Sequence, residues 1–242
     1  MLATVIIPTY NERGNIGRIV REVLAQGPEF RVLVVDDDSP DGTAEEAQEV
    51  RSAEPDRVQV CRRRRKWGLG SAYLYGFAKA LEEGADRIFE MDADFSHPPS
   101  ALRPLLEASL RADFSVGSRY VPGGAVENWP WSRRALSIAG NLYARAVLLC
   151  GVKDLTAGFK CYRREVLENI DLWSLRSTGY AFQVETTWRA LRAGFRIEEV
   201  PIRFLEREVG SSKMSKGIIG EAAKVVWKLR LSRHVPRGRR RP

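Results

Sequence analysis

Short apolar runs alternate with amphipathic stretches along the first two-thirds of the chain. Runs rich in β-branched and aromatic residues predict strands, and apolar positions spaced three or four residues apart predict helices. The predicted strands are residues 3–7, 32–35, 58–61, 87–91 and 114–116. The predicted helices between them are residues 16–24, 43–51, 71–82 and 102–110. This alternation predicts an α/β fold with a mostly parallel central sheet and helices on both faces.

The pattern is looser after Gly117. Residues 120–131 are rich in Gly, Pro and Trp and predict a loop. Helices are predicted at residues 134–149 and 182–193, and a strand near residues 195–200. The segment at residues 156–163, between the two helices, is given no secondary structure. Residues 217–231 again have helical spacing. We therefore expect one domain over residues 1–216, followed by a basic amphipathic helix and tail over residues 217–242.

The composition is that of a soluble globular protein in a reducing compartment. Hydrophobic residues make up 44% of the chain and charged residues 29%. Cys61, Cys150 and Cys161 are scattered and lack the spacing of a disulfide framework or a zinc site. We expect no signal peptide and no spanning helix, because no apolar run approaches the necessary length. A cytoplasmic location with only peripheral membrane contact is the expectation.

Positive charge is concentrated towards the C-terminal end. The formal net charge is +8, and residues 203–242 contain 12 basic and 3 acidic residues. A basic amphipathic helix bearing Trp227 would be attracted to anionic headgroups on the cytoplasmic face of a membrane. A helix packed on the core and followed by a solvated tail explains the same pattern equally well. Both interpretations stay open at this stage.

Polar loops follow three of the predicted strands. The sequence Pro-Thr-Tyr-Asn-Glu follows the first strand, Asp-Asp-Asp-Ser-Pro-Asp-Gly-Thr the second, and Asp92-Ala93-Asp94 the fourth. In open parallel sheets, ligands bind at the carboxyl ends of the strands. Two carboxylates one residue apart can share a hard cation such as Mg²⁺ or Mn²⁺ and leave positions for phosphate oxygens. A solvated acidic turn is the alternative for such a short motif.

Three consecutive carboxylates, Asp36 to Asp38, end the second strand. Turn formation and helix capping explain Asp41 or Thr43 nearby. They do not explain three adjacent charges that repel one another. A hydrogen-bonding ligand such as a nucleoside is a reason to keep them.

Taken together, the segments VIIPTYNE, VVDDDSPDGT, GLGSAYLYGF and MDADFSHPP, in this order, resemble the GT-A glycosyltransferases of family 2. Within that family the likeness is closest to the dolichol-phosphate (polyprenol-monophosphate) mannose synthases. It extends through SRYVPGG, DLTAGFK, GYAFQVE and REVGSSK. The resemblance implies a Rossmann-like GT-A fold and an inverting transfer of mannose from GDP-mannose to a polyprenyl (dolichyl) phosphate.

The resemblance also implies roles for individual residues. Asp92 and Asp94 would hold the metal, Mg²⁺ or Mn²⁺, with Ser96 at a place where some relatives have a metal-contacting Gln. Arg119, Arg133 and Arg134 would bind the acceptor phosphate, and Asp92, Asp94, Arg119 and Arg207 would form the catalytic set. The residues implied for the donor site are Pro8, Tyr10, Glu12, Val35, Asp37, Asp92, Ala93, Asp94, Arg119, Arg207 and Lys213. Some members of the family work with a separate membrane subunit.

This reaction needs no dedicated general base. A phosphate monoester has a second pKa of about 6 and is largely dianionic at neutral pH. The site must instead bring two anionic groups together and neutralise the departing diphosphate, which a metal ion and guanidinium groups can do.

Other functions fit parts of the pattern. A glucose transfer from UDP-glucose, or transfer to a hydroxyl acceptor, would use the same fold. A metal-dependent nucleotidyltransferase also combines an α/β fold with paired carboxylates, but it normally has an early glycine-rich phosphate loop. The basic run at residues 62–66 beside Trp67 would suit nucleic acid, but no nucleic-acid-binding module is present and we expect no such partner.

His97 is either a metal ligand or a structural residue, and the second is favoured.

Overall fold

A seven-stranded sheet forms the centre of the molecule in the computed structural model, which describes residues 1–175, 177, 179–205 and 216–232. The strands follow the order β3-β2-β1-β4-β7-β5-β8. Their bounds are β1 (Ala3–Thr9), β2 (Phe30–Asp36), β3 (Val58–Arg62), β4 (Arg87–Glu90), β5 (Phe114–Ser118), β7 (Lys160–Arg163) and β8 (Ile197–Pro201). Two short strands, β6 (Ala125–Val126) and β9 (Arg203–Phe204), pair with each other.

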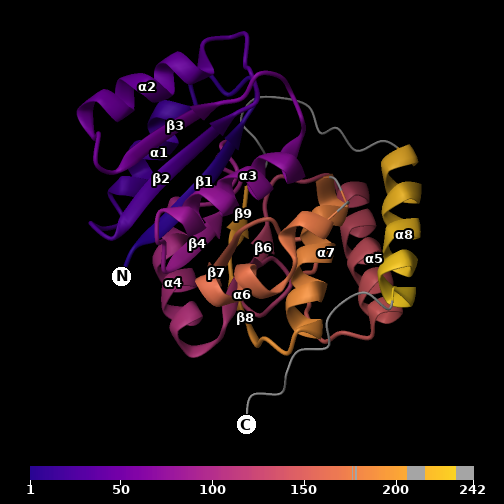
Figure 1. Ribbon diagram of the computed structural model, residues 1–242. Helices are drawn as coiled ribbons and strands as arrows, with labels where there is room; N and C mark the ends of the chain where they lie inside the picture. Colours follow the sequence, from indigo (N-terminus) through magenta and orange to yellow (C-terminus); the bar gives the residue numbers. More distant parts are fainter. Residues whose placement is uncertain (176, 178, 206–215, 233–242) are drawn as a thin grey trace.

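Helices cover both faces of this sheet (Figure 1). The helices of the described residues are α1 (Ile16–Leu24), α2 (Thr43–Ala53), α3 (Leu69–Glu82), η1 (Pro99–Ala101), α4 (Leu102–Arg111), α5 (Trp131–Leu148), α6 (Arg164–Asn169), η2 (Leu172–Ser174), α7 (Gly179–Arg192) and α8 (Lys216–Leu231). One buried cluster joins the sheet to α1, α2 and α4, and a second joins it to α3, α6 and α7. Side chains of β2 alternate between the two, with Val32 and Val34 in the first and Leu33 and Val35 in the second. The predicted α/β architecture is confirmed.

The sheet is parallel except at β7. This strand runs antiparallel to both of its neighbours, β4 and β5. We predicted no strand at residues 160–163 and no helix at α6. The segment Lys-Cys-Tyr-Arg begins and ends with a cation, so it lacks the apolar signature of a central strand, and only tertiary contacts explain why Lys160 is buried there.

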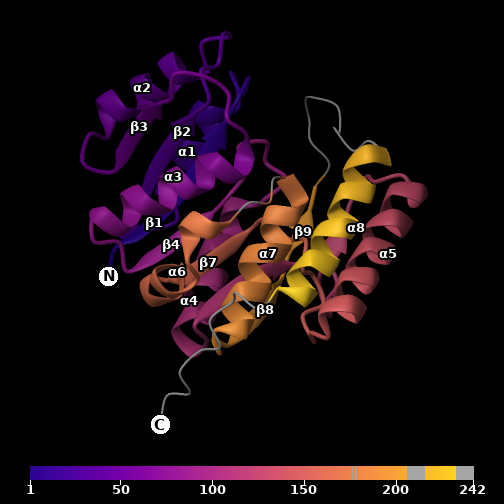
Figure 2. The same ribbon diagram turned by 45° about the vertical axis from the view of Figure 1, so that its right-hand side comes forward.

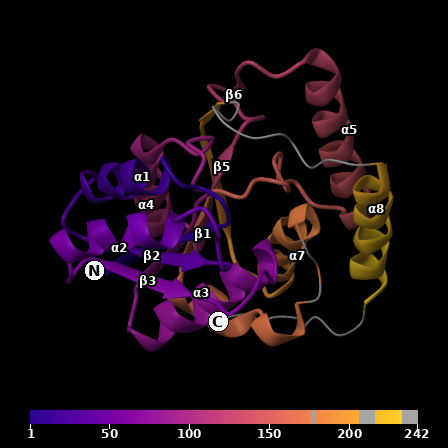
Figure 3. The ribbon, with the colours of Figure 1, turned by 90° about the horizontal axis from the view of Figure 1, so that it is seen from above.

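Helices α5 and α8 lie side by side at the end of the molecule opposite β2 and β3 (Figures 2 and 3). A third apolar cluster joins them to α7 through Leu148, Trp188, Val226 and Leu229. The helix predicted at residues 217–231 therefore packs on the core along one side, while Trp227 on its other side is half exposed. The basic tail after Ser232 lies outside the described residues.

None of the helices that the structure describes combines the length and apolar character needed to cross a bilayer.

Candidate functional site

The polar loops after β1 and β2 bind each other at one edge of the sheet. The Thr9 hydroxyl donates to buried Asp36 at 2.9 Å, and Asp36 also accepts from the backbone and hydroxyl of Ser39. The backbone N–H groups of Asn11 and Glu12 donate to the hydroxyls of Ser39 and Thr43 in the second loop. The convergence expected from the positions of these loops is present, and Asp36 has a structural role in it.

The other two carboxylates of the Asp36–Asp38 run are paired with cations of the segment after β3. Asp37 is buried, forms an ion pair with Arg63 and accepts from the backbone N–H groups of Trp67 and Gly68 at 3.0 and 2.9 Å. Asp38 is exposed and pairs with Arg62 at 3.2 Å. Each of the three carboxylates thus has its own partners within the protein, and these offset the repulsion between the carboxylates.

The remaining residues expected at a nucleoside lie around these loops. The ring of Tyr10 is partly buried, and the Lys66 ammonium lies 3.5 Å from its centre. Pro8 and Glu12 are also partly buried. The Val35 side chain is fully buried in the core, so only its backbone can face a ligand.

The segment after β4 places the two aspartates in different surroundings. Asp92 is 29% exposed and accepts from the Tyr73 hydroxyl at 3.3 Å. Asp94 is 5% exposed and accepts from both the backbone N–H and the hydroxyl of Ser96. Ala93 between them packs into the core. Ser96 therefore supports Asp94, and any contact it makes with a metal remains a proposal.

Tyr73 is a fixed hydrogen-bond donor beneath Asp92. It is fully buried in α3, with its ring stacked on Phe182 of α7 at 6.1 Å between centres. Burial raises the pKa of Tyr73 well above its ordinary value, and the negative charge of Asp92 adds to the shift. The phenol consequently stays protonated and orients the Asp92 carboxylate.

His97 holds the backbone of the same segment. Its Nδ1 accepts from the N–H of Asp92 at 3.0 Å. Its ring stacks on Phe159 at 5.0 Å and meets the ring of Phe204 edge-on at 5.7 Å. The interpretation of His97 as a structural residue fits these contacts, since it locks the position from which Asp92 leaves the strand.

This contact predicts a metal phenotype for His97 variants. His97→Leu removes the acceptor for the Asp92 N–H and should raise the Mg²⁺ concentration for half-maximal activity about 10- to 100-fold, the range found for residues that orient metal ligands. His97→Asn, whose Oδ1 can replace Nδ1, should recover most of the loss. Titration of activity with Mg²⁺ at saturating donor measures this. Equal behaviour of the two variants would contradict the orienting role.

A buried polar cluster supports the end of β4. The Lys160 ammonium donates to Gln183 and Thr186 of α7, and the Tyr162 hydroxyl donates to Glu90 at 3.0 Å. Burial lowers the pKa of Lys160 to about 8, and the charges of Glu90 and Asp154 oppose this shift. Burial raises the pKa of Glu90, against the charge of Lys160. Because Glu90 lies two residues before Asp92, the cluster fixes the strand from which the two aspartates project.

A metal ion at Asp92 and Asp94 would need further ligands. Within the described ranges, no group of three or more His, Cys, Asp or Glu side chains is arranged to hold a metal ion. Mg²⁺ is commonly bound by one or two carboxylates together with substrate phosphates and water. The two carboxylates therefore fit a cation that enters with a diphosphate.

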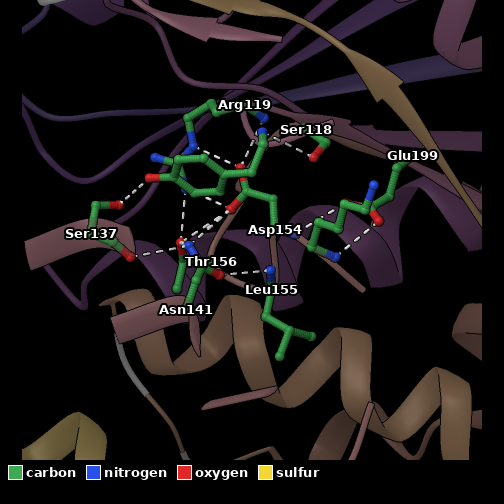
Figure 4. Close-up of polar contacts among 10 residues, drawn as sticks. Ser118, Arg119, Ser137, Asn141, Asp154, Leu155, Thr156 and Glu199 are labelled. Carbon is green, nitrogen blue, oxygen red and sulfur yellow. Dashed lines mark hydrogen bonds and ion pairs between the residues drawn. The ribbon is translucent and has the colours of Figure 1, made fainter. Parts of the chain in front are cut away.

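Arg119 has a set of partners that we did not foresee (Figure 4). Its Nε and one terminal nitrogen each donate to buried Asp154 at 2.7 Å, and the same terminal nitrogen donates to Thr156. Asn141 of α5 donates to Thr156 and accepts from the N–H of Leu155. The Arg119–Asp154 pair thus ties the end of β5 to α5 and to the segment before β7.

Aromatic rings surround the same guanidinium. Arg119 lies 5.3 Å from the ring centre of Phe204 and 5.8 Å from that of Trp129. The guanidinium of Arg133 also contacts Trp129, at 4.0 Å from the centre of the indole ring. The structure therefore brings Arg119 and Arg133 to one indole ring. Arg134 is exposed.

Two expected residues, Arg207 and Lys213, lie outside the described residues. Conversely, the sequence did not reveal Arg63, Tyr73, Asp154, Trp129 or Phe204 as parts of the site. Tyr73 and Asp154 lie in segments that we had noted as motifs, which was the available signal for them. Arg63 lies in the basic run at residues 62–66 and Trp129 in the loop at residues 120–131, and both segments had been noted for other reasons. Phe204 had no such signal.

Comparison with known proteins gives one family and several similar chains. The profile of the family described as Glycosyl transferase family 2 matches residues 4–171. A polyprenol monophosphomannose synthase of Mycolicibacterium smegmatis is 55% identical over 90% of this chain and 83% of its own length. An undecaprenyl-phosphate mannosyltransferase of Micrococcus luteus is 51% identical over 92% and 91%, respectively. A dolichol-phosphate mannosyltransferase of Pyrococcus furiosus is 38% identical over 95% of this chain and 64% of its own.

Solved structures with the same fold include glucosyl-3-phosphoglycerate synthase from Mycobacterium tuberculosis. In its complex with Mn²⁺, UDP and glucosyl-3-phosphoglycerate, the TM-score is 0.65 at 18% identity, over 94% of this chain and 78% of that one. At this identity the likeness establishes the fold alone.

Proposed function

Since this chain belongs to glycosyl transferase family 2, we propose that it transfers mannose from GDP-mannose to a polyprenyl phosphate, with inversion at the anomeric carbon. Relatives at 51–55% identity named for mannose transfer to a polyprenol or undecaprenyl phosphate support the acceptor class and the sugar. The observation that carries the proposal is the pair Asp92 and Asp94 at the end of β4, both held in place by buried neighbours.

The two aspartates fit the diphosphate end of a nucleotide sugar. A divalent cation bound there, Mg²⁺ or Mn²⁺, would neutralise the charge that develops on the departing GDP. Tyr73 and Ser96 each donate a hydrogen bond to one of the carboxylates, which fixes the direction in which the carboxylates face. The neighbouring loop with Pro8, Tyr10, Glu12 and Asp37 would border the nucleoside.

Asp37 would contribute to the nucleoside site indirectly, because it holds the loop between β3 and α3. Its carboxylate accepts from Trp67 and Gly68 at the start of α3 and pairs with Arg63. That loop also carries Lys66, whose ammonium covers Tyr10. We propose that this loop forms one wall of the site for the nucleobase. Lys66 would move off the Tyr10 ring when the nucleoside binds.

The acceptor phosphate would approach from the β5 side. The chain leaves β5 at Arg119, and β5 is two strands from β4 in the sheet. Because β4 and β5 both run antiparallel to β7, their carboxyl ends lie at the same edge, about 10 Å apart. Arg133 and Arg134, together with Arg207 and Lys213 from the part not described, would supply positive charge there. A phosphate dianion needs no base to attack the anomeric carbon.

A lipid acceptor requires contact with a membrane surface. Helices α5 and α8 carry exposed apolar side chains, including Trp131, Leu142 and Trp227, and cations such as Lys228 and Arg230 lie among them. We propose that this side of the molecule rests peripherally on the cytoplasmic face of the membrane, alone or with a membrane subunit. The basic tail would add attraction to anionic headgroups.

Donor binding and turnover test the proposal together. Calorimetric titration should show that Mg²⁺ or Mn²⁺ increases the affinity for GDP at least about tenfold, because the cation bridges the carboxylates to the diphosphate. In the presence of a polyprenyl phosphate, GDP-mannose should give mannosyl lipid and GDP. Turnover of UDP-glucose alone would overturn the mannose assignment. Release of pyrophosphate would instead indicate a nucleotidyltransferase.

A further inference from the structure

A pocket beside α5 contains two cations, Arg145 and Lys153, that the proposed reaction does not use. Its volume is about 300 Å³, and its wall includes Arg134, Arg145, Lys153, Val121, Ile138 and Leu142. Three positive charges and three aliphatic side chains thus face one space. Arg119 and Asn141 border it from the network of Figure 4.

The charges of the pocket are not neutralised within the part of the chain that the structure describes. No carboxylate there forms an ion pair with Arg134, Arg145 or Lys153, and the buried Nε of Arg145 has no hydrogen-bond partner. The adjoining carboxylates are already engaged: Asp154 accepts from Arg119, while Glu199 accepts from the N–H groups of Lys153 and Asp154. Cations held together without an acid favour an anionic ligand.

The Lys153 end of the pocket lies away from the two aspartates. The backbone N–H of Lys153 donates to Glu199, in the middle of β8, and β8 is three strands from β4 in the sheet. Three strand spacings amount to about 14 Å. A reacting oxygen must approach the anomeric carbon to about 3–3.5 Å. A phosphate held at Lys153 would therefore lie farther from the donor than one at Arg119, which follows β5, and this favours a ligand separate from the phosphate that is mannosylated.

The ligand must also match the apolar part of the wall. Leu142 is 54% exposed and Ile138 37% exposed, on the same helix as Arg134 and Arg145. The pocket consequently meets the side of α5 that carries exposed apolar residues. A phosphate attached to hydrocarbon satisfies both halves of this surface, whereas free phosphate satisfies only the cations.

We propose that this pocket binds the phosphate of a bilayer phospholipid through Arg145 and Lys153 and so fixes how α5 rests on the membrane. The inference rests on the proposed lipid acceptor, but it concerns a second phosphate that is not consumed. A bound headgroup would set the height of Arg119 and Arg133 above the bilayer, where the acceptor phosphate arrives.

Binding of a water-soluble phospholipid tests the site directly. Dihexanoyl-phosphatidylglycerol, below its micelle concentration, should bind the full-length protein saturably with one molecule per chain. Arg145→Gln and Lys153→Gln should each weaken this binding about tenfold or more, since each removes a charged donor to the phosphate. The control is Arg31→Gln with Arg51→Gln. These exposed residues belong to β2 and α2, which lie at the end of the molecule away from α5 (Figure 1), and the double substitution should leave binding unchanged. Absence of saturable binding, or equal loss in the control, would overturn the proposal.

Turnover without membranes separates this site from the acceptor site. With a short, water-soluble prenyl phosphate and no vesicles, Arg145→Gln and Lys153→Gln should keep the KM and kcat of the unaltered protein. A raised KM for that acceptor would assign the pocket to the acceptor and refute a separate phospholipid site. Lack of turnover by the unaltered protein would instead count against the proposed function. With vesicles of phosphatidylcholine and phosphatidylglycerol and a long-chain acceptor, both variants should turn over more slowly.

Discussion

Asp94→Asn is expected to lower mannosyl transfer about a thousandfold, because the carboxylate would hold the cation that neutralises the departing diphosphate, and the loss of such electrostatic stabilisation costs rate on this scale. The amide keeps the size of the buried side chain and can still accept from Ser96, so the fold should persist. Steady-state rates with GDP-mannose, together with a thermal melt, measure both effects. Asp94→Ala should be as inactive and somewhat less stable, since it also leaves Ser96 without its acceptor.

A matched substitution separates the charge from its support. Ser96→Ala keeps the carboxylate of Asp94 and removes only one hydrogen bond, so we expect a far smaller loss of rate than in Asp94→Asn. The enhancement of GDP affinity by Mg²⁺ should disappear in Asp94→Asn and persist in Ser96→Ala. Normal metal-dependent GDP binding in Asp94→Asn would rule out this aspartate as part of a metal clamp.

Arg119→Met is expected to lower the free energy of unfolding by about 3–5 kcal/mol, the cost of leaving one member of a buried ion pair without its partner. Arg119 is 6% exposed in its side chain, and Asp154 is fully buried. Asp154→Asn should therefore destabilise by a similar amount. In the double variant the losses should be far from additive, because the second substitution removes a charge that is already unpaired. The unaltered protein, the two single variants and the double variant form a double-mutant cycle. Urea unfolding of these four proteins gives the coupling energy between Arg119 and Asp154.

A surface pair serves as the control for this cycle. Arg111 pairs with Glu198 at 2.5 Å, but its side chain is 63% exposed. Arg111→Met should cost no more than about 1 kcal/mol. If Arg119→Met left stability unchanged and raised only the KM for the acceptor, the guanidinium would be a phosphate ligand and not a structural tie. The implied role in phosphate binding and the observed pair thus give different results.

The order of strands and helices was predictable because it follows from local patterns. Apolar alternation and helical spacing placed the first five strands and the four helices between them within a few residues of their observed bounds. The same patterns placed Asp92 and Asp94 after a buried strand, so a candidate metal site required no tertiary information. Strand β7 escaped prediction because its burial depends on partners for Lys160 that come from α7.

The partners of the charged residues were not predictable from local patterns. Asp37 and Arg63 are 26 positions apart, and Arg119 and Asp154 are 35 apart. We interpreted Asp37 as a nucleoside ligand and Arg119 as a phosphate ligand from their motifs, and neither role has been tested. In the structure both side chains also hold the surrounding loops together. A motif identifies a residue type at a position, but it does not indicate which remote side chain will reach it.

By itself the sequence determined the α/β alternation, the parallel arrangement of most strands and the acidic segment after β4, because these depend on neighbours only a few residues away. Tertiary structure alone decided which charges are paired, which remain available in the pocket beside α5, and how His97 and Tyr73 hold Asp92. The physical reason is that the energy of a charge depends on its burial and on the distance to other charges. Packing between distant segments sets both quantities.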